Sequence, residues 1–386
     1  MKRVILFFCI MMFLIQPINL SAEETQPDLE LKGKSVILIE QDTGEVLYEN
    51  NSNQSLPPAS MTKMMTMLLI AEAIEEGRIA LNDTVIISEN AASMGGSQIF
   101  LEPNEKMSVD DLLKAVAIAS ANDASVALAE YVYGSEQSFI QAMNQRLTDL
   151  GLEETQFQNT TGLTAENHYS SAHDMAMIAR ALLRYQFITD YTSIYEDYLR
   201  KDSEDEFWLV NTNRLVKFYP GVDGLKTGFT QEAKYCLTAT ALKDNMRLIA
   251  VVMGAETPKE RNATISSLLD YGYAHFQHQS LYTTDQTVTE LEITKGKVSQ
   301  IAVVPRENAS ILTKKGVDTS QIETKIIVDQ QLVAPIEEND LVGTLEIYLD
   351  NQIIEVVDLV AKQSVDRANI WQLTVDSFRR LVKIGN

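Results

Sequence analysis

Apolar and polar residues follow different patterns along the chain, and these patterns predict where helices and strands form. Apolar runs at 35–39 and 46–48 flank an Asp-Thr-Gly turn, a combination that predicts a β-hairpin. From Ser60 onward, segments rich in helix formers predict helices over 60–76, 110–133, 136–150 and 172–183. Strand patterns then return before a last helix, with strands over 224–230, 235–241 and 248–253 and the helix over 259–273.

This order of elements predicts two domains. Strands at both ends of 30–277, with helices between them, favour an α/β domain whose antiparallel sheet is covered by a helical cluster. Residues 281–366 differ, because they are rich in β-branched residues and turn signals and show little helical periodicity. Apolar runs at 345–349 and 353–357 flank an Asp-Asn pair, which is another hairpin signal. We therefore expect a small all-β C-terminal domain.

Residues 367–386 form a third pattern. On a helical wheel with steps of about 100° the apolar and polar side chains fall on opposite arcs. The apolar arc holds Ile370, Trp371, Leu373, Val375, Phe378, Leu381, Val382 and Ile384. The segment carries +3, from Arg367, Arg379, Arg380 and Lys383 against Asp376. A basic amphipathic helix of this kind is typical of the membrane interface, so we expect an anchor on a membrane surface; the alternative is a helix packed on the β domain.

The N-terminus predicts export. Lys2 and Arg3 precede an apolar run over 4–15, and small residues up to Ala22 allow cleavage there. This is the pattern of a signal peptide over 1–22, and the apolar run is too short to span a bilayer well. The alternative is a buried N-terminal helix. We expect the mature protein on the outer face of the cytoplasmic membrane, peripherally anchored.

Composition excludes several classes of function. With 45% hydrophobic and 22% charged residues, the chain is a folded globular protein and not a disordered one. Its net charge of −22 repels phosphate backbones, so we expect no nucleic-acid partner. Cys9 and Cys236 cannot make a disulfide framework. His275 and His278 are three residues apart but lack a third ligand, so we expect them on a helix surface and expect no metal or cofactor.

Ser60 is the candidate nucleophile. It stands at the start of a predicted helix, within the sequence PASMTK, and Lys63 follows one turn later on the same face. A serine hydroxyl needs a base, and a desolvated lysine with a lowered pKa can be that base. The helix N-terminus also directs N–H groups towards negative charge that develops on a substrate. By itself this spacing is weak evidence, because roughly one or two such pairs occur by chance in a chain of this length.

Two further motifs strengthen the assignment. Ser120 and Asn122 place a hydroxyl and an amide two residues apart. Lys226, Thr227 and Gly228 place a cation, a hydroxyl and a residue without a side chain on one predicted strand. The same kinds of motif, in the same order, are typical of class A β-lactamases and penicillin-binding proteins, which are serine enzymes.

With these motifs the chain resembles the low-molecular-mass penicillin-binding proteins, which are serine-type D-alanyl-D-alanine carboxypeptidases. The resemblance covers 33–386, and its most specific stretches are 58–63, 120–130, 169–180 and 219–230. It implies an α/β domain of the serine transpeptidase/β-lactamase-like fold, then a β-rich domain and an amphipathic C-terminal helix. It also implies that the substrate is the peptidoglycan pentapeptide with its D-Ala-D-Ala terminus, and that β-lactams acylate the serine.

The resemblance gives each matching residue a role. Ser60 attacks the peptide carbonyl and forms an acyl-enzyme, Lys63 accepts its proton, and Ser120 relays a proton to the departing D-alanine. The N–H groups of Ser60 and Phe229 form the oxyanion hole, while Thr227 and Arg261 hold the terminal carboxylate. The full set of expected substrate-binding residues is Asn122, Lys226, Thr227, Gly228, Phe229 and Arg261.

Two positions depart from the family pattern, and two other functions stay open. Thr161 stands where many relatives have histidine, so the details of deacylation do not carry over, and Lys234 stands where glycine is common. A class A-like β-lactamase is one alternative, although Glu166 lacks the expected E-x-x-L-N context and such an enzyme needs neither a second domain nor an anchor. A non-catalytic wall-binding or β-lactam-sensing protein is the other, although all three motifs are complete.

Overall fold

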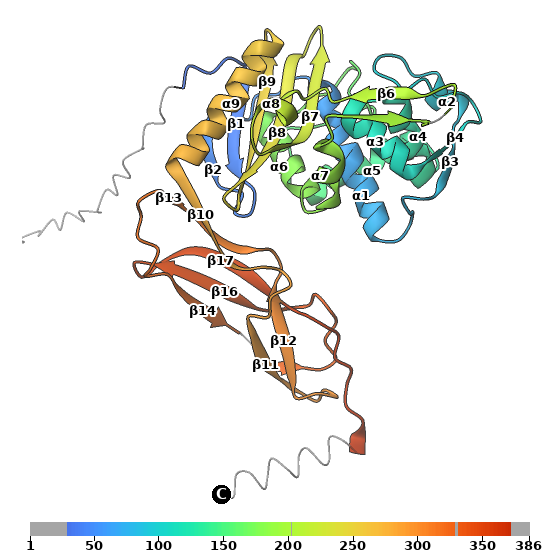
Figure 1. Ribbon diagram of the computed structural model, residues 1–386. Coiled ribbons are helices and arrows are strands. Elements are labelled where there is room, and N and C mark those ends of the chain that lie inside the picture. The colour runs from blue at the N-terminus through green and yellow to red at the C-terminus, as the bar shows by residue number, and fades with distance from the viewer. Residues whose placement is uncertain (1–28, 202, 329–330, 372–386) are drawn as a thin grey trace, which may run out of the picture.

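The computed structural model describes residues 29–371 except 202 and 329–330, and the first domain is built on one antiparallel sheet (Figure 1). Its five strands lie in the order β2-β1-β9-β8-β7. They come from both ends of the domain: β1 (Ser35–Glu40), β2 (Val46–Asn50), β7 (Val222–Thr230), β8 (Lys234–Lys243) and β9 (Met246–Ala255). The predicted hairpin and the predicted antiparallel sheet are confirmed.

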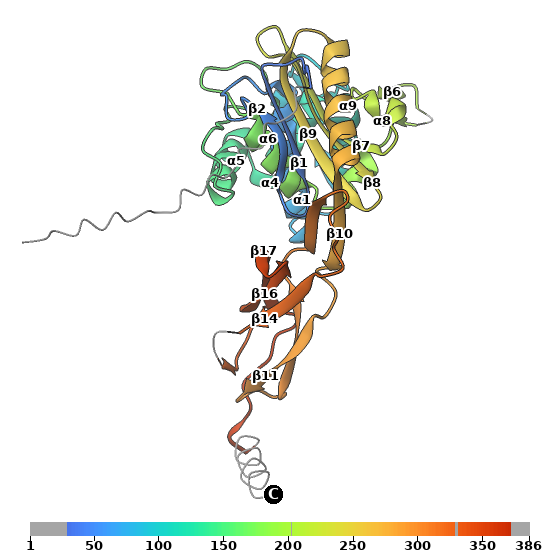
Figure 2. The ribbon, with the colours of Figure 1, turned by 90° about the vertical axis from the view of Figure 1, so that its left-hand side faces the viewer.

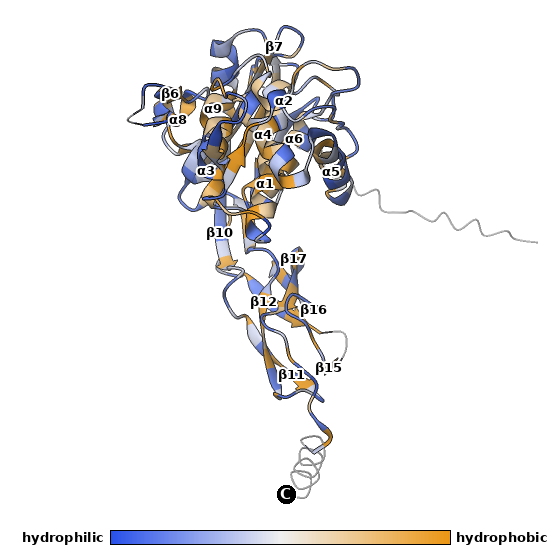
Figure 3. Ribbon diagram, turned by 90° about the vertical axis from the view of Figure 1, so that its right-hand side faces the viewer, coloured by the Kyte–Doolittle hydropathy of each residue, from blue (hydrophilic) through white to orange (hydrophobic). Residues whose placement is uncertain are grey.

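Helices surround this sheet. They are η1 (Ala59–Thr62, a 3₁₀ turn), α1 (Lys63–Glu75), α2 (Glu89–Ala92), α3 (Val109–Ala119), α4 (Asn122–Tyr133), α5 (Glu136–Asp149), α6 (Ala172–Leu182), α7 (Phe187–Thr192), α8 (Leu215–Phe218) and α9 (Pro258–His275). Figure 3 shows α1 mostly hydrophobic and α5 largely hydrophilic, which matches the central place of α1 and the outer place of α5.

The two faces of the sheet contribute to two separate cores. In β1, Ile37 and Ile39 pack into the core that contains α1 and α6, whereas Val36 and Leu38 pack into the core that contains α9. Successive side chains of a strand point to opposite faces, so the apolar run at 35–39 has to be covered on both sides. Figure 2 shows α9 on one face of the sheet and α6 on the other.

The helix predicted over 110–133 is wrong in one respect, because the chain forms two helices there. Helix α3 ends before Ser120, which adopts φ +62°, and α4 begins at Asn122. The residues on both sides are helix formers, so composition alone does not reveal the break. Two short strand pairs, β3 (Thr84–Ile86) with β4 (Lys106–Ser108) and β5 (Glu196–Leu199) with β6 (Phe207–Val210), also escape prediction because they are only three or four residues long.

The second domain is all-β, as predicted. Its strands are β10 (Phe276–Tyr282), β11 (Thr289–Thr294), β12 (Gln300–Pro305), β13 (Ala309–Lys314), β14 (Glu323–Ile327), β15 (Leu332–Val333), β16 (Leu341–Leu349) and β17 (Gln352–Ala361). Six of them form a sheet in the order β14-β16-β17-β12-β11-β15, and β10 pairs with β13. In the predicted β16–β17 hairpin, Asp350 and Asn351 have φ +51° and +62°, as a tight turn of type I′ requires.

The prediction that His278 lies on a helix surface is wrong. Helix α9 ends at His275 and the chain continues directly into β10, so His278 is the third residue of a strand. Its side chain is 2% exposed, because it is enclosed where the two domains meet. This part of the chain is a strand because β10 pairs with β13, with His278 opposite Leu312.

The second domain extends away from the first, and Ile370 and Trp371, the last described residues, lie at its far end (Figures 1 and 2). Both side chains are exposed, at 84% and 77%. The predicted signal peptide 1–22 and residues 372–386 of the predicted anchor helix 367–386 lie outside the described residues. In the described part of the chain, no helix has the length and hydrophobicity needed to cross a membrane.

Candidate active site

Ser60 and Lys63 come together where η1 turns into α1. Ser60 lies within η1 and Lys63 is the first residue of α1, and their Oγ and Nζ atoms are 3.2 Å apart. Ala59, directly before the serine, adopts φ +48°, a left-handed conformation that is rare for a residue with a side chain. Surrounding structure must hold this turn in place.

Two glycines allow that structure to approach the turn. A Cβ atom at Gly162 would lie 1.8 Å from the carbonyl oxygen of Ala59, and one at Gly228 would lie 2.7 Å from the carbonyl oxygen of Pro58. Both neighbours are backbone atoms, so they cannot rotate away. The two glycines let a loop and strand β7 press on the segment that carries the serine.

The Lys63 amine has three partners. It lies 2.6 Å from Asn122 Oδ1, 2.7 Å from the carbonyl oxygen of Thr161 and 3.2 Å from Ser60 Oγ. The amide and carbonyl oxygens can only accept hydrogen bonds. A neutral amine donates its two N–H bonds to them and directs its lone pair at the Ser60 hydroxyl, which then donates to the nitrogen. This is the arrangement of a base that takes the proton of Ser60.

Burial is the main reason for this amine to be neutral. The Lys63 side chain is fully buried, and desolvation lowers its pKa well below the usual 10.5. The positive charge of Lys226 lowers the pKa further, and only Asp123 acts in the opposite direction. Asp123 accepts hydrogen bonds from the N–H groups of Ile99 and Leu101 at 3.0 and 3.1 Å, so its charge is already partly compensated.

Asn122 and Ser120 stand between α3 and α4. Asn122 Nδ2 donates to the carbonyl oxygen of Gly95 at 2.6 Å, which turns its Oδ1 towards Lys63. Ser120 is 3% exposed, and within the described residues its Oγ has no hydrogen-bond partner. Its φ of +62° is a strained conformation for serine. A buried hydroxyl without a partner next to Asn122 is available to a substrate.

Strand β7 forms the opposite side of the site. Alternate residues of a strand share a face, so Lys226 and Gly228 both point towards η1. Lys226 is 1% exposed, and its amine donates to the carbonyl oxygen of Thr227 at 3.2 Å. The Thr227 hydroxyl donates to that of Thr212 at 2.7 Å. Phe229 follows at 47% exposure, with its ring 4.4 Å from that of Tyr235.

Arg261 adds a second buried cation at this side. It lies in the first turn of α9, is 7% exposed, and donates through Nε and Nη2 to Asn262 Oδ1 at 3.0 Å. Burial, and after it the charge of Arg261, lower the pKa of Lys226 to about 7. In the part of the chain that the structure describes, no carboxylate forms an ion pair with either residue. Two neighbouring cations without an anion favour the binding of a carboxylate.

Sequence reasoning missed the loop that presents the Thr161 carbonyl. Asn159 Oδ1 accepts hydrogen bonds from the N–H groups of Thr161 and Gly162 at 3.1 and 2.7 Å, and from the Thr161 hydroxyl at 3.1 Å. The side chain of Asn159 thereby fixes the backbone that contacts Lys63. An asparagine two residues before a Thr-Gly pair is the signal that was available, because asparagine often closes such a turn.

It also missed His168. Gln158 donates its N–H to His168 Nδ1 at 3.0 Å, so the ring donates from Nε2 to the Thr62 hydroxyl at 2.9 Å. Thr62 in turn donates to the carbonyl oxygen of Ala59 at 2.9 Å. Burial lowers the pKa of His168 to about 4, so the ring stays neutral. His168 supports the turn that carries Ser60 and does not touch the serine.

The site has the parts of a serine acyl-transfer centre and no ligand set for a metal. In the described part of the chain, the one group of His, Asp and Glu side chains close enough to hold an ion is Glu40, Asp42 and His278, which lies elsewhere. The active-site arrangement combines a nucleophile with its base on one side and a cationic pocket on the other. Such a site can cleave an amide bond near a free carboxylate.

Two family models match the chain, one for each domain. The model described as D-alanyl-D-alanine carboxypeptidase matches residues 21–257, and the model described as penicillin-binding protein 5, C-terminal domain, matches residues 276–367.

Relatives match over nearly the whole length. The D-alanyl-D-alanine carboxypeptidase DacF of Bacillus subtilis is 51% identical, over 95% of this chain and 96% of that protein. DacC of Escherichia coli is 33% identical, over 96% of this chain and 94% of that protein. The crystal structure of penicillin-binding protein 5 from Haemophilus influenzae is similar with a TM-score of 0.70 and 32% identity, covering 89% of this chain and 99% of that one.

Proposed function

The chain belongs to the D-alanyl-D-alanine carboxypeptidase family and is a serine D-Ala-D-Ala carboxypeptidase, and from this premise we propose which of its residues carry the reaction. The proposal has two parts, one at each side of the site. Ser60 and Lys63 perform the chemistry with Ser120, and the residues on β7 and α9 recognise the end of the substrate.

Acylation begins with the neutral amine of Lys63. Ser60 Oγ attacks the carbonyl carbon between the two D-alanines while its proton passes to Lys63 Nζ, 3.2 Å away. The oxygen of the tetrahedral intermediate then lies between the N–H groups of Ser60 and Phe229. The Gly228 contact with Pro58 supports this pairing of N–H groups, because it sets β7 directly beside η1.

Release of D-alanine requires a proton on the departing nitrogen. The Ser120 hydroxyl, which has no hydrogen-bond partner among the described residues, donates that proton and is replenished from the Lys63 ammonium. The C–N bond breaks and the acyl group stays on Ser60. Water then attacks the ester and Lys63 takes the proton of the water. Lys63 returns that proton to Ser60 Oγ as the C–O bond to Ser60 breaks.

The cationic side gives the enzyme its preference for a chain terminus. The substrate's terminal carboxylate binds between Lys226, Arg261 and the Thr227 hydroxyl, while Asn122 Nδ2 and the β7 backbone align the peptide. The buried cations carry this part of the proposal, because neither has an acidic partner in the described structure. β-Lactams have a carboxylate beside a reactive amide, so we expect them to bind in the same way and to acylate Ser60.

The observation that carries the whole proposal is the 3.2 Å contact between Ser60 Oγ and the buried amine of Lys63. Ser60→Ala should abolish both D-alanine release from a diacyl-Lys-D-Ala-D-Ala peptide and labelling by fluorescent penicillin. Ser125→Ala is the control, because it removes a buried serine hydroxyl that has no hydrogen-bond partner in the described part of the chain. Penicillin labelling that survives in the folded Ser60→Ala variant would contradict the assignment.

We further propose that residues 1–22 direct export and that 367–386 hold the enzyme on the outer face of the cytoplasmic membrane. The position of Ile370 and Trp371 supports this, since they are exposed at the end of the β domain farthest from the catalytic domain (Figure 1). Basic residues near the surface of an anionic membrane add roughly 1 kcal/mol each. The mature protein should therefore float with anionic liposomes and a chain truncated after 366 should not, with unchanged kcat on small peptides. If both float alike, or neither does, the anchor proposal fails.

A further inference from the structure

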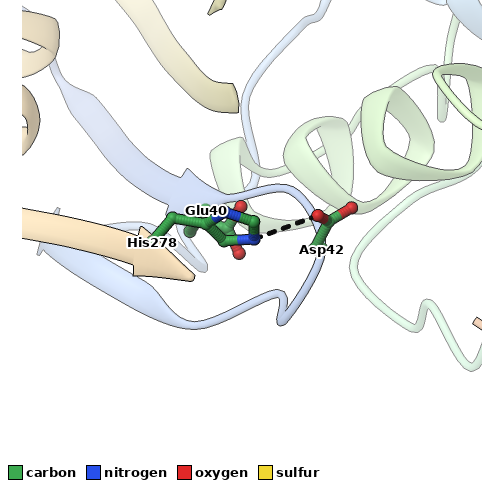
Figure 4. Close-up of side chains that lie close together, drawn as sticks. All are labelled: Glu40, Asp42 and His278. Carbon is green, nitrogen blue, oxygen red and sulfur yellow. Dashed lines mark ion pairs between the residues drawn. The ribbon is translucent and has the colours of Figure 1, made fainter. Parts of the chain in front are cut away.

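The junction between the two domains holds a buried group of metal-binding side chains that the carboxypeptidase reaction does not use. Glu40 ends β1, Asp42 lies in the turn that follows, and His278 lies on β10, the strand that leads into the second domain. One ligand atom from each of the three lies within 4.8 Å of the others. Figure 4 shows the imidazole of His278 extending towards Asp42, with Glu40 beside the ring.

Several atoms in this group lack hydrogen-bond partners. Glu40 is fully buried, and its Oε1 has no partner among the described residues. The His278 side chain is 2% exposed, and neither of its ring nitrogens has a partner with hydrogen-bond geometry. Buried polar atoms without partners are rare in folded proteins, and a bound ion is one of the known reasons for them.

The contact between His278 and Asp42 has the geometry of two ligands around one ion. His278 Nε2 and Asp42 Oδ2 are 3.1 Å apart, but the ring N–H direction does not align with that oxygen. Two atoms that each bind a tetrahedral Zn²⁺ at about 2.0–2.1 Å are separated by about 3.3 Å, and neither points at the other. A cation beside the ring nitrogen therefore fits this contact better than a shared proton does.

Charge leads to the same conclusion. Two carboxylates with a protonated imidazole would leave the group with one net negative charge. Glu40 and His278 are both shielded from water, where such a charge is unfavourable. A divalent cation with a neutral imidazole makes the group electrically neutral. An imidazole nitrogen and carboxylate oxygens are both ligand types that Zn²⁺ binds, and three of them leave the fourth position of a tetrahedral ion for water.

Neighbouring groups already orient the carboxylates. Thr43 donates its N–H and its hydroxyl to Glu40 Oε2 at 2.8 and 2.9 Å, which leaves Oε1 for a ligand bond. From the second domain, Asn308 donates to Asp42 Oδ1 at 3.3 Å and Ser310 to Asp42 Oδ2 at 3.4 Å. Outer partners of this kind fix the orientation of metal ligands. Asp42 also lines two cavities of about 420 and 310 Å³, which give an ion a way in.

We infer that Glu40, Asp42 and His278 form a binding site for a divalent transition-metal ion, with Zn²⁺ as the best fit. The ion would tie the β1–β2 turn of the catalytic domain to the first strand of the β domain. It would therefore hold the two domains in a fixed orientation and take no part in peptide cleavage.

The test is metal binding by the purified full chain after treatment with EDTA and dialysis. Titration with Zn²⁺ in a calorimeter should show one bound ion per chain, and Co²⁺ should give the visible absorption of a bound tetrahedral ion. His278→Gln and Asp42→Asn should each weaken Zn²⁺ binding at least roughly 100-fold, since loss of an outer partner alone costs 10–100-fold. His275→Gln is the matched control, because His275 lies three residues earlier on the exposed end of α9.

Folding of the variants is checked by their unchanged D-alanine release from a small peptide. Saturating Zn²⁺ should raise the Tm of the wild type by roughly 5 °C and leave that of His278→Gln unchanged. Two results would overturn the inference: a folded wild type that binds neither Zn²⁺ nor Co²⁺ at a single site, or a His278→Gln variant that binds them as the wild type does.

Discussion

The two sides of the active site hold buried lysines in opposite situations. On the α1 side, the amine of Lys63 lies close to two acceptor oxygens, of Asn122 and Thr161, and to the hydroxyl of Ser60. On the β7 side, the amine of Lys226 reaches one backbone carbonyl at 3.2 Å and shares its surroundings with Arg261. Lys63 is saturated with partners, whereas Lys226 is not.

We propose that this difference lets one site use the same side chain for two tasks. A lysine whose N–H bonds are already occupied and which is fully desolvated serves as a base. A lysine that stands beside another cation, without an acidic partner, serves to bind an anion. The surroundings of each amine, and not the residue type, assign the role, and substitutions on the two sides should therefore have different effects.

The largest effect should follow from removing the base. Lys63→Ala should lower the rate of acylation by about 10²–10⁴-fold, because proton transfer typically contributes that factor. The loss should be similar for peptides and for fluorescent penicillin, measured as the rate of covalent labelling. Lys234→Ala is the control, since Lys234 lies at the end of β8 with 39% of its side chain exposed. Equal labelling rates in the wild type and in Lys63→Ala would remove Lys63 from the chemistry.

The next effect concerns the turn that carries Ser60. Gly162→Ala places a Cβ against the Ala59 carbonyl, which must shift, and a displacement of about 1 Å in a catalytic group costs on the order of 10²-fold in rate. Gly134→Ala is the matched control, because Gly134 has a similar φ of +77° but no atom within 4 Å of the added Cβ. The rates of D-alanine release by the two variants show whether activity is lost through the clash with Ala59 or through the strain of an alanine at positive φ. Equal losses in both would show that the contact with Ala59 is unimportant.

A smaller effect should distinguish substrates at the cationic side. A hydrogen bond between charged groups contributes roughly 1.5–3 kcal/mol, so Arg261→Ala should lower kcat/KM about 10- to 100-fold for a free-acid peptide. A peptide with an amidated C-terminus should already be poor for the wild type and should lose little more. Steady-state kinetics with both peptides provide the test, and equal losses would make Arg261 a structural residue.

The smallest effect is a shift in pH dependence. In the enzyme without substrate, Lys226 has a pKa of about 7. Its positive charge is therefore lost as the pH rises through that value, and kcat/KM for a free-acid peptide should decline with it. The charge of Arg261 lowers this pKa, so its removal in Arg261→Gln raises the pKa and moves the decline to higher pH. The pH profiles of the two enzymes test this, and a shift to lower pH would contradict the proposed proximity of the two cations.

The sequence predicted the sheet, the main helices and the motif residues, because each rests on local spacing. Ser60 and Lys63 are one helical turn apart, and the residues of β7 follow one another along a strand. The structure adds contacts between residues far apart in the chain. Asn159 fixes the Thr161 carbonyl, and that carbonyl reaches Lys63 across 98 positions, which no local pattern reveals.

Two other features were beyond prediction for a different physical reason. The break at Ser120 depends on a single left-handed residue between segments of equally good helix formers, and packing, not propensity, selects it. His278 lies on a strand because the second domain supplies β13 as a partner for β10. A strand that requires a partner from a separate part of the chain cannot be read from its own seven residues.

The central claim is that Lys63 is neutral when the free enzyme meets its substrate. The direct measurement is the ¹³Cε chemical shift of Lys63 as a function of pH, in protein labelled with ¹³C-lysine and with the signal assigned through Lys63→Arg. The account predicts that the Lys63 signal titrates well below the usual lysine pKa of 10.5. A Lys63 signal of a charged amine that titrates near 10.5 would contradict the account.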